Sequence, residues 1–84
     1  MNSKHRKTLE KIFKQPIISD ILWNDSELML KALGAEISEG SGSRVRIQLN
    51  GVRAVFHRPH PENKTDKGAV KSMMRFLQNA GVTV

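Results

Sequence analysis

Asn50-Gly51 limits the possible folds of this chain more than any other pair of residues. It lies between two segments, 44–49 and 52–57, in which apolar and polar residues alternate. An Asn-Gly pair favours the two-residue turn of a β-hairpin, because both residues tolerate the positive φ angles that this turn needs. Alternation with a period of two is typical of half-buried strands. The sequence therefore predicts an antiparallel hairpin with one apolar and one polar face.

The turn also fixes which residues of the hairpin lie opposite each other. Leu49 is predicted to face Val52, and counting outward pairs Arg44 with His57. The face expected to join the core carries Val45, Ile47, Leu49, Val52, Ala54 and Phe56. The other face carries Arg44, Arg46, Gln48, Arg53, Val55 and His57. Opposite residues in such a ladder have Cβ atoms about 5 Å apart, so we expect an imidazole beside a permanent cation.

Two helices are predicted before the hairpin from the helical spacing of apolar residues. The first covers Ser3 to Gln15, has a cationic face and stops at Pro16. An irregular apolar connector, Ile17 to Trp23, is expected to follow and to place Trp23 in the core. The second helix is predicted to start at an Asn24 cap with Glu27 as reciprocal acceptor, and Gly34 is expected to close it.

A strand at 35–38 and a last helix complete the predicted domain. The strand alternates as the hairpin does, and the helix is expected to begin at Thr65 or Asp66, run to Ala80 and close at Gly81. We therefore predict an α+β fold in which a three-stranded antiparallel sheet has helices on one face and is open on the other. With 84 residues the chain is expected to be a single domain, 1–84.

Composition narrows the possible partners and surroundings. The net charge of +6 and the pI of about 10.2 favour an anionic partner such as nucleic acid or an acidic protein. The chain has no cysteine and no apolar run that approaches the length of a membrane span. We therefore expect a soluble, unprocessed cytoplasmic protein that needs no disulfide, metal or cofactor and no membrane.

Four short motifs follow one another along the chain: LGAEISEGSGSRVRI, His60-Pro61, Lys67-Gly68 and the final FLQNAGV. Together they resemble the HicA family of small toxins from toxin-antitoxin pairs, and the likeness covers about Asn24 to Val82. The resemblance implies a fold like that of double-stranded-RNA-binding domains, metal-free cleavage of mRNA, and silencing by a HicB antitoxin. It also implies a division into an N-terminal helical extension, 1–22, and a family core, 23–84.

The sequence departs from the family at the residue that would do proton chemistry. The family's functional histidine follows a Gly-Ser pair, whereas this chain has Gly42-Ser43-Arg44. A guanidinium can neutralise a phosphate, but its pKa is too high for it to act as base or acid near neutral pH. His57, predicted to lie opposite Arg44, is our candidate replacement, with Arg44 and Arg46 holding the phosphate and His60 as a second proton donor.

Other features are open to a functional and a structural interpretation. Gly42 and Ser43 belong to a small-residue loop that either contacts RNA or only turns the chain. Cationic residues Arg46, Arg53, Lys67, Lys71 and Arg75 are candidate RNA contacts. For the last three, which recur every four residues along the final helix, simple solvation of a surface stripe is the alternative. The short spacing of His57 and His60 could suggest zinc, but no full set of ligands accompanies them.

Three classes of function remain after these arguments. The chain could be a ribonuclease toxin, a non-catalytic RNA-binding module, or a module that binds an antitoxin-like protein through a degenerate active face. Arg44 is the residue that separates the first class from the others, because it stands where the resemblance expects a histidine.

Overall fold

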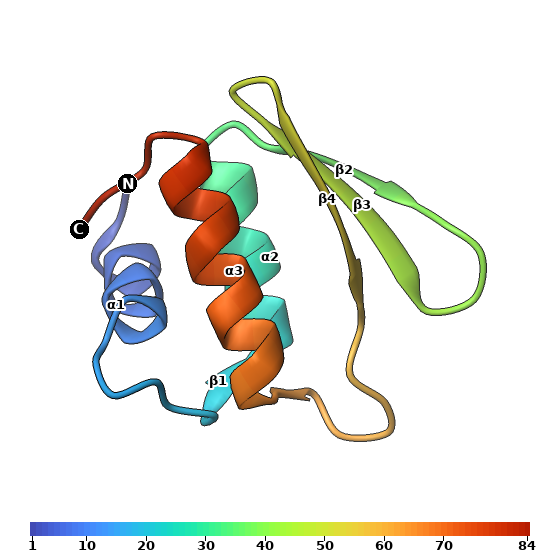
Figure 1. Ribbon diagram of the computed structural model, residues 1–84, viewed down its shortest axis with the longest axis horizontal. Coiled ribbons are helices and arrows are strands. Elements are labelled where there is room, and N and C mark those ends of the chain that lie inside the picture. The colour runs from blue at the N-terminus through green and yellow to red at the C-terminus, as the bar shows by residue number, and fades with distance from the viewer.

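A computed structural model describes residues 1–84 and confirms the predicted α+β class. In chain order the elements are α1 (Ser3–Ile12), β1 (Ile21–Leu22), α2 (Trp23–Ala32), β2 (Glu36–Glu39), β3 (Arg44–Leu49), β4 (Val52–His57), β5 (Lys64–Thr65) and α3 (Lys67–Asn79). Strands β2, β3 and β4 form an antiparallel sheet in that order. Helices α2 and α3 cover one face of this sheet, and α1 lies beyond them on the side away from the sheet (Figure 1).

The hairpin of β3 and β4 has the predicted register throughout. Leu49 pairs with Val52, and the ladder continues without a break to Arg44 opposite His57. Asn50 and Gly51 both have positive φ, 51° and 81°, as the tight turn requires. The Asn50 side chain also donates a hydrogen bond to the carbonyl oxygen of Ala80 at 2.8 Å. The turn is thus fixed to the end of α3 as well as by its own backbone.

The first two helices differ from prediction at their ends. Helix α1 ends at Ile12 rather than Gln15. The predicted Asn24 cap is wrong, because α2 begins at Trp23 and its N-cap, Leu22, makes no side-chain hydrogen bond. The carboxylate of Glu27 is engaged elsewhere, since it accepts from the indole N–H of Trp23 and from Arg58.

Both predicted closing glycines have the expected conformation. Gly34 after α2 has a φ of 94°, and Gly81 after α3 has a φ of 81°. The N–H of Ala35 donates to the carbonyl of Leu30 at 3.0 Å, and the N–H of Val82 donates to that of Leu77 at 2.9 Å. These bonds satisfy carbonyl groups that have no partner inside the helix.

A second, two-stranded sheet was not predicted. In it Ile21 pairs with Thr65 and Leu22 with Lys64, antiparallel. Part of the expected irregular connector is therefore strand β1, and Thr65 belongs to β5 instead of capping α3. Asp66 is the cap, because its carboxylate accepts from the N–H of Ala69 at 2.8 Å. Two-residue strands are too short to show a period, so only their spatial pairing reveals them.

One hydrophobic core joins the sheet to all three helices. The indole of Trp23, 1% exposed, has its ring centroid 5.7 Å from that of Phe56, and Phe56 meets Phe76 edge-on at 6.2 Å. This confirms Trp23 as a packing anchor. Leu9 and Ile12 of α1 belong to the same cluster. None of the three helices is both long and apolar enough to span a membrane.

Candidate functional site

The sheet face turned away from the helices, here called the outer face, carries four of the residues predicted to act on a ligand, Arg44, Arg46, Arg53 and His57. The ladders place its side chains in three rows across the strands. The rows are Glu36, Gln48 and Arg53; then Ser38, Arg46 and Val55; and finally Arg44 with His57. Arg44, Arg46, Arg53 and His57 are all exposed. The outer face is therefore a cationic surface that water and ligands can reach.

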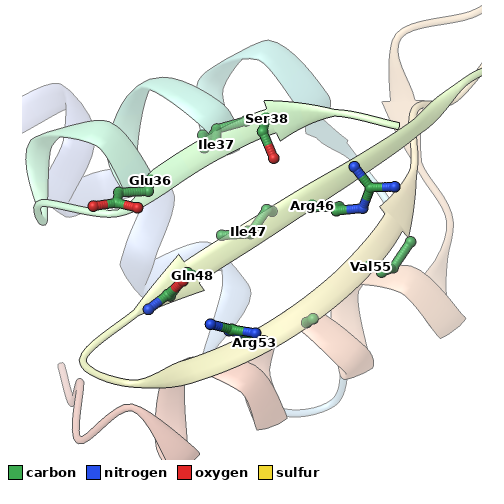
Figure 2. A pocket seen from close by; sticks show the side chains of 9 residues that line it. Glu36, Ile37, Ser38, Arg46, Ile47, Gln48, Arg53 and Val55 are labelled. Carbon is green, nitrogen blue, oxygen red and sulfur yellow. The ribbon is translucent and has the colours of Figure 1, made fainter. Parts of the chain in front are cut away.

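The first two rows form a shallow groove of about 610 Å³. Its lining residues come from β2, β3 and β4 and include Arg46, Gln48 and Arg53 (Figure 2). The groove also has apolar surface, to which Val55, 58% exposed, contributes. Guanidinium and amide donors beside apolar surface suit a ligand that combines anionic oxygens with flat or apolar parts.

Arg44 and His57 lie directly opposite each other in the last row, outside the groove. Arg44 forms no ion pair with any carboxylate. Its guanidinium therefore remains available for an added anion. Arg46, in the next row, donates to the main-chain carbonyl of Glu39 at 3.3 Å, which restricts its side chain. A titratable ring and two cations thus occupy neighbouring rows at one end of the sheet.

The predicted small-residue loop is a closed turn between β2 and β3. The N–H of Gly40 donates to the carbonyl of Arg44 at 2.9 Å, and the N–H of Arg44 donates to that of Ser41 at 3.2 Å. Gly40 is needed for this close approach, since a Cβ there would lie 3.0 Å from the Cβ of Arg44. Gly42, with a φ of 63°, and Ser43 are exposed at the turn beside Arg44.

Arg58 is an organising residue to which the sequence interpretation gave no role. Its Nε donates to Glu27 of α2 at 2.6 Å, and its Nη2 donates to Glu39 at the end of β2 at 2.8 Å. Its main-chain N–H donates to the carbonyl of Ser43 at 2.9 Å. One residue thus connects α2, β2 and the turn next to Arg44. The signal was present, because continuing the period of two past Phe56 puts Arg58 on the core side, where a cation needs partners.

Ion pairing within this cluster changes the acidity of its members. The hydrogen bond from Arg58 lowers the pKa of Glu39 below its ordinary value of about 4.5. The same bond, with the one to Glu27, raises the pKa of Arg58. A carboxyl whose pKa is lower in the folded chain than in the unfolded chain stabilises the fold above the unfolded pKa. This contribution is lost as the pH falls through the folded pKa.

We therefore predict that Glu39→Gln lowers the free energy of unfolding at pH 7 but not at a pH well below 4. Urea unfolding at a series of pH values measures this difference. Glu36→Gln, on the same strand but without contact to Arg58, is the matched control. An equal deficit of the Glu39 variant at pH 7 and at pH 3 would contradict the prediction.

The remaining predicted residues lie elsewhere. His60 is exposed in the loop between β4 and β5. Lys67, Lys71 and Arg75 are exposed on α3, in the helical layer on the other side of the sheet from the outer face (Figure 1). The structure thus brings Arg44, Arg46, Arg53 and His57 onto one surface and separates the α3 stripe from it. No three His, Cys, Asp or Glu side chains gather into a possible metal site.

Comparison with known proteins identifies a family. A family model described as "HicA toxin of bacterial toxin-antitoxin" matches residues 23–82. The matched region begins at α2 and includes the whole outer face, whereas α1 precedes it. No curated protein and no solved structure matches the chain.

Proposed function

Because this chain belongs to the HicA family of bacterial toxin-antitoxin toxins, we propose that it binds mRNA in the cytoplasm and cleaves it without a metal ion. As a toxin of this kind it pairs with an antitoxin, and we propose that the antitoxin is HicB-like. The observation that carries the proposed activity is the pairing of Arg44 with His57 across the hairpin. This pairing supports the proposal because His57, which can transfer protons, lies opposite Arg44, the position at which the family motif has its histidine.

The proposed reaction is an internal transfer at one phosphate of the RNA. His57 takes the proton of the 2′-OH, whose oxygen attacks the neighbouring phosphorus. As the new P–O2′ bond forms, the P–O5′ bond breaks, and His60 gives a proton to the leaving 5′ oxygen. Arg44 and Arg46 stabilise the charge that builds on the phosphoryl oxygens. The products are a 2′,3′-cyclic phosphate and a 5′-hydroxyl end, so no water or metal enters this step.

Binding of the rest of the RNA is proposed to use cations on two surfaces. Arg53, with Arg46, lines the groove on the outer face, and Gly42 and Ser43 offer a small turn beside the reacting phosphate. Lys67, Lys71 and Arg75 are exposed on α3 and are proposed to contact the RNA backbone farther along. Such contacts position the RNA and make its affinity depend on salt.

A second candidate function rests on Arg44 itself. A guanidinium in place of the family histidine cannot accept a proton near neutral pH. The same outer face would then bind RNA, or an antitoxin-like protein, without cutting anything. This alternative keeps the fold and the charge of the site and removes only the chemistry.

Incubation of the purified chain with an RNA transcript and excess chelator tests the proposal. We expect shortened RNA whose new ends carry a cyclic phosphate, together with growth arrest when the chain is expressed alone. RNA that is bound but stays intact would favour the non-catalytic alternative. Tight binding of the partner protein with neither RNA binding nor growth arrest would favour the protein-binding module.

A further inference from the structure

Half of the chain's net charge lies outside the region that matches the family. Residues 1–16 contain five cations, Lys4, Arg6, Lys7, Lys11 and Lys14, and one anion, Glu10. Asp20 is a second anion before the family match, which begins at residue 23, so residues 1–22 contribute 5 − 2 = +3 of the net +6. The outer face of the sheet does not account for this charge.

Packing of α1 fixes where its cations point. Thr8, Leu9 and Ile12 are buried, so the opposite side of the helix is turned to solvent. That side, here called the lysine face, consists of Lys7, Glu10, Lys11 and Lys14, which line a shallow depression without an apolar residue. Lys4 pairs with Asp25 at 3.8 Å, whereas Lys7, Lys11 and Lys14 form no ion pair. Three cations without an ion-pair partner thus lie together beside Glu10, with Lys7 and Lys11 on α1 and Lys14 just after its end.

The lysine face and the outer face lie at opposite ends of the molecule. In Figure 1 the longest axis is horizontal, with α1 at the left, the sheet at the right, and α2 and α3 between them. The molecule extends 31 Å along that axis. A ligand seated across the outer face therefore does not reach the lysine face unless it passes around the helices.

The chemistry of the lysine face selects one kind of partner. A protein interface is centred on buried apolar or aromatic anchors, and this depression has none. A helix that lies on a membrane inserts its apolar side, but the apolar side of α1 is inside the core. A nucleic-acid backbone needs only spaced positive charge, because its phosphates are bound through release of counterions. We propose that the lysine face is a second binding site for the RNA phosphate backbone, separate from the site on the outer face.

Salt dependence of RNA binding tests this proposal. Each phosphate contact on a single strand contributes about 0.7 to the slope of log K against log salt concentration. Replacing Lys11 and Lys14 together by glutamine is therefore expected to reduce the magnitude of this slope by about 1.4. Fluorescence anisotropy of a labelled single-stranded RNA at several salt concentrations measures it, with 2′-O-methyl groups throughout the RNA so that no 2′-OH is available for cleavage.

The matched control is Lys31→Gln with Lys64→Gln, two exposed cations on α2 and β5, which changes the net charge equally. We expect the control to keep the slope of the parent chain, and circular dichroism checks that both variants are folded. Equal slopes in the two variants would overturn the proposal. So would a loss of binding to polyglutamate, a stand-in for an acidic protein, with RNA binding unchanged. Cleavage plays no part in these measurements, so the proposed catalysis can fail independently.

Discussion

Replacing His57 with alanine is expected to slow RNA cleavage by roughly 10²- to 10⁴-fold, the range that general acid-base catalysis usually supplies. Binding of RNA should change little, because the arginines of the outer face remain. His57 is exposed at the last pair of the ladder, so the substitution removes no core contact. Rate constants for cleavage of a fixed RNA at pH 7, with protein in excess, measure the effect.

Two further variants separate the proton chemistry from the charge. His60→Ala is expected to slow cleavage less than His57→Ala, because His60 protonates a leaving group that water can also reach. Arg44→His restores the family's Gly-Ser-His motif and is expected to retain cleavage in the absence of His57. Unchanged cleavage by His57→Ala would reject the assignment of His57 and show that another residue carries out the proton transfer.

Arg58→Met is expected to lower the free energy of unfolding by about 2 kcal/mol. This substitution removes the cation that pairs with the carboxylate of Glu27. The Glu27 side chain is only 14% exposed, so its charge would be left largely buried and unpaired. Removing one partner of a fully buried pair costs roughly 3–5 kcal/mol. The expected value is smaller because a third of the Arg58 side chain is exposed. In a domain of this size the melting temperature should fall by about 4–8 °C for each kcal/mol.

A double-mutant cycle tests whether the lost ion pair is the cause. In a Glu27→Gln chain the amide oxygen can still accept from Trp23, but no buried charge is left to compensate. Arg58→Met should therefore cost clearly less in that chain than in the parent. Arg46→Met, on the exposed outer face, is the control and is expected to change stability by no more than about 0.5 kcal/mol. Equal costs of Arg58→Met in both chains would show that the ion pair with Glu27 does not explain the loss.

Periodic features of the chain could be predicted because their causes are local. The Asn50-Gly51 turn and the alternation on either side fix the register of β3 and β4, and with it the meeting of Arg44 and His57. Gly34 and Gly81 close helices because each adopts a positive φ without steric cost. The family resemblance, first based on short motifs, is confirmed by the match over residues 23–82. The catalytic roles of His57 and His60 stay predictions.

Local patterns in the sequence were enough to predict the three helices, the hairpin and the cationic outer face, because turn chemistry and side-chain period act between near neighbours. Three long-range features became known only from the folded structure. Ile21 pairs with Thr65, and Arg58 connects Glu27 with Glu39. Helix α1 is separated from the sheet by α2 and α3 (Figure 1). These contacts join residues far apart in the chain, and no local pattern records which distant partner a side chain or a short strand will meet. For that reason the positive charge of the first helix could be predicted from the sequence, but its separation from the outer face could be seen only in the folded structure.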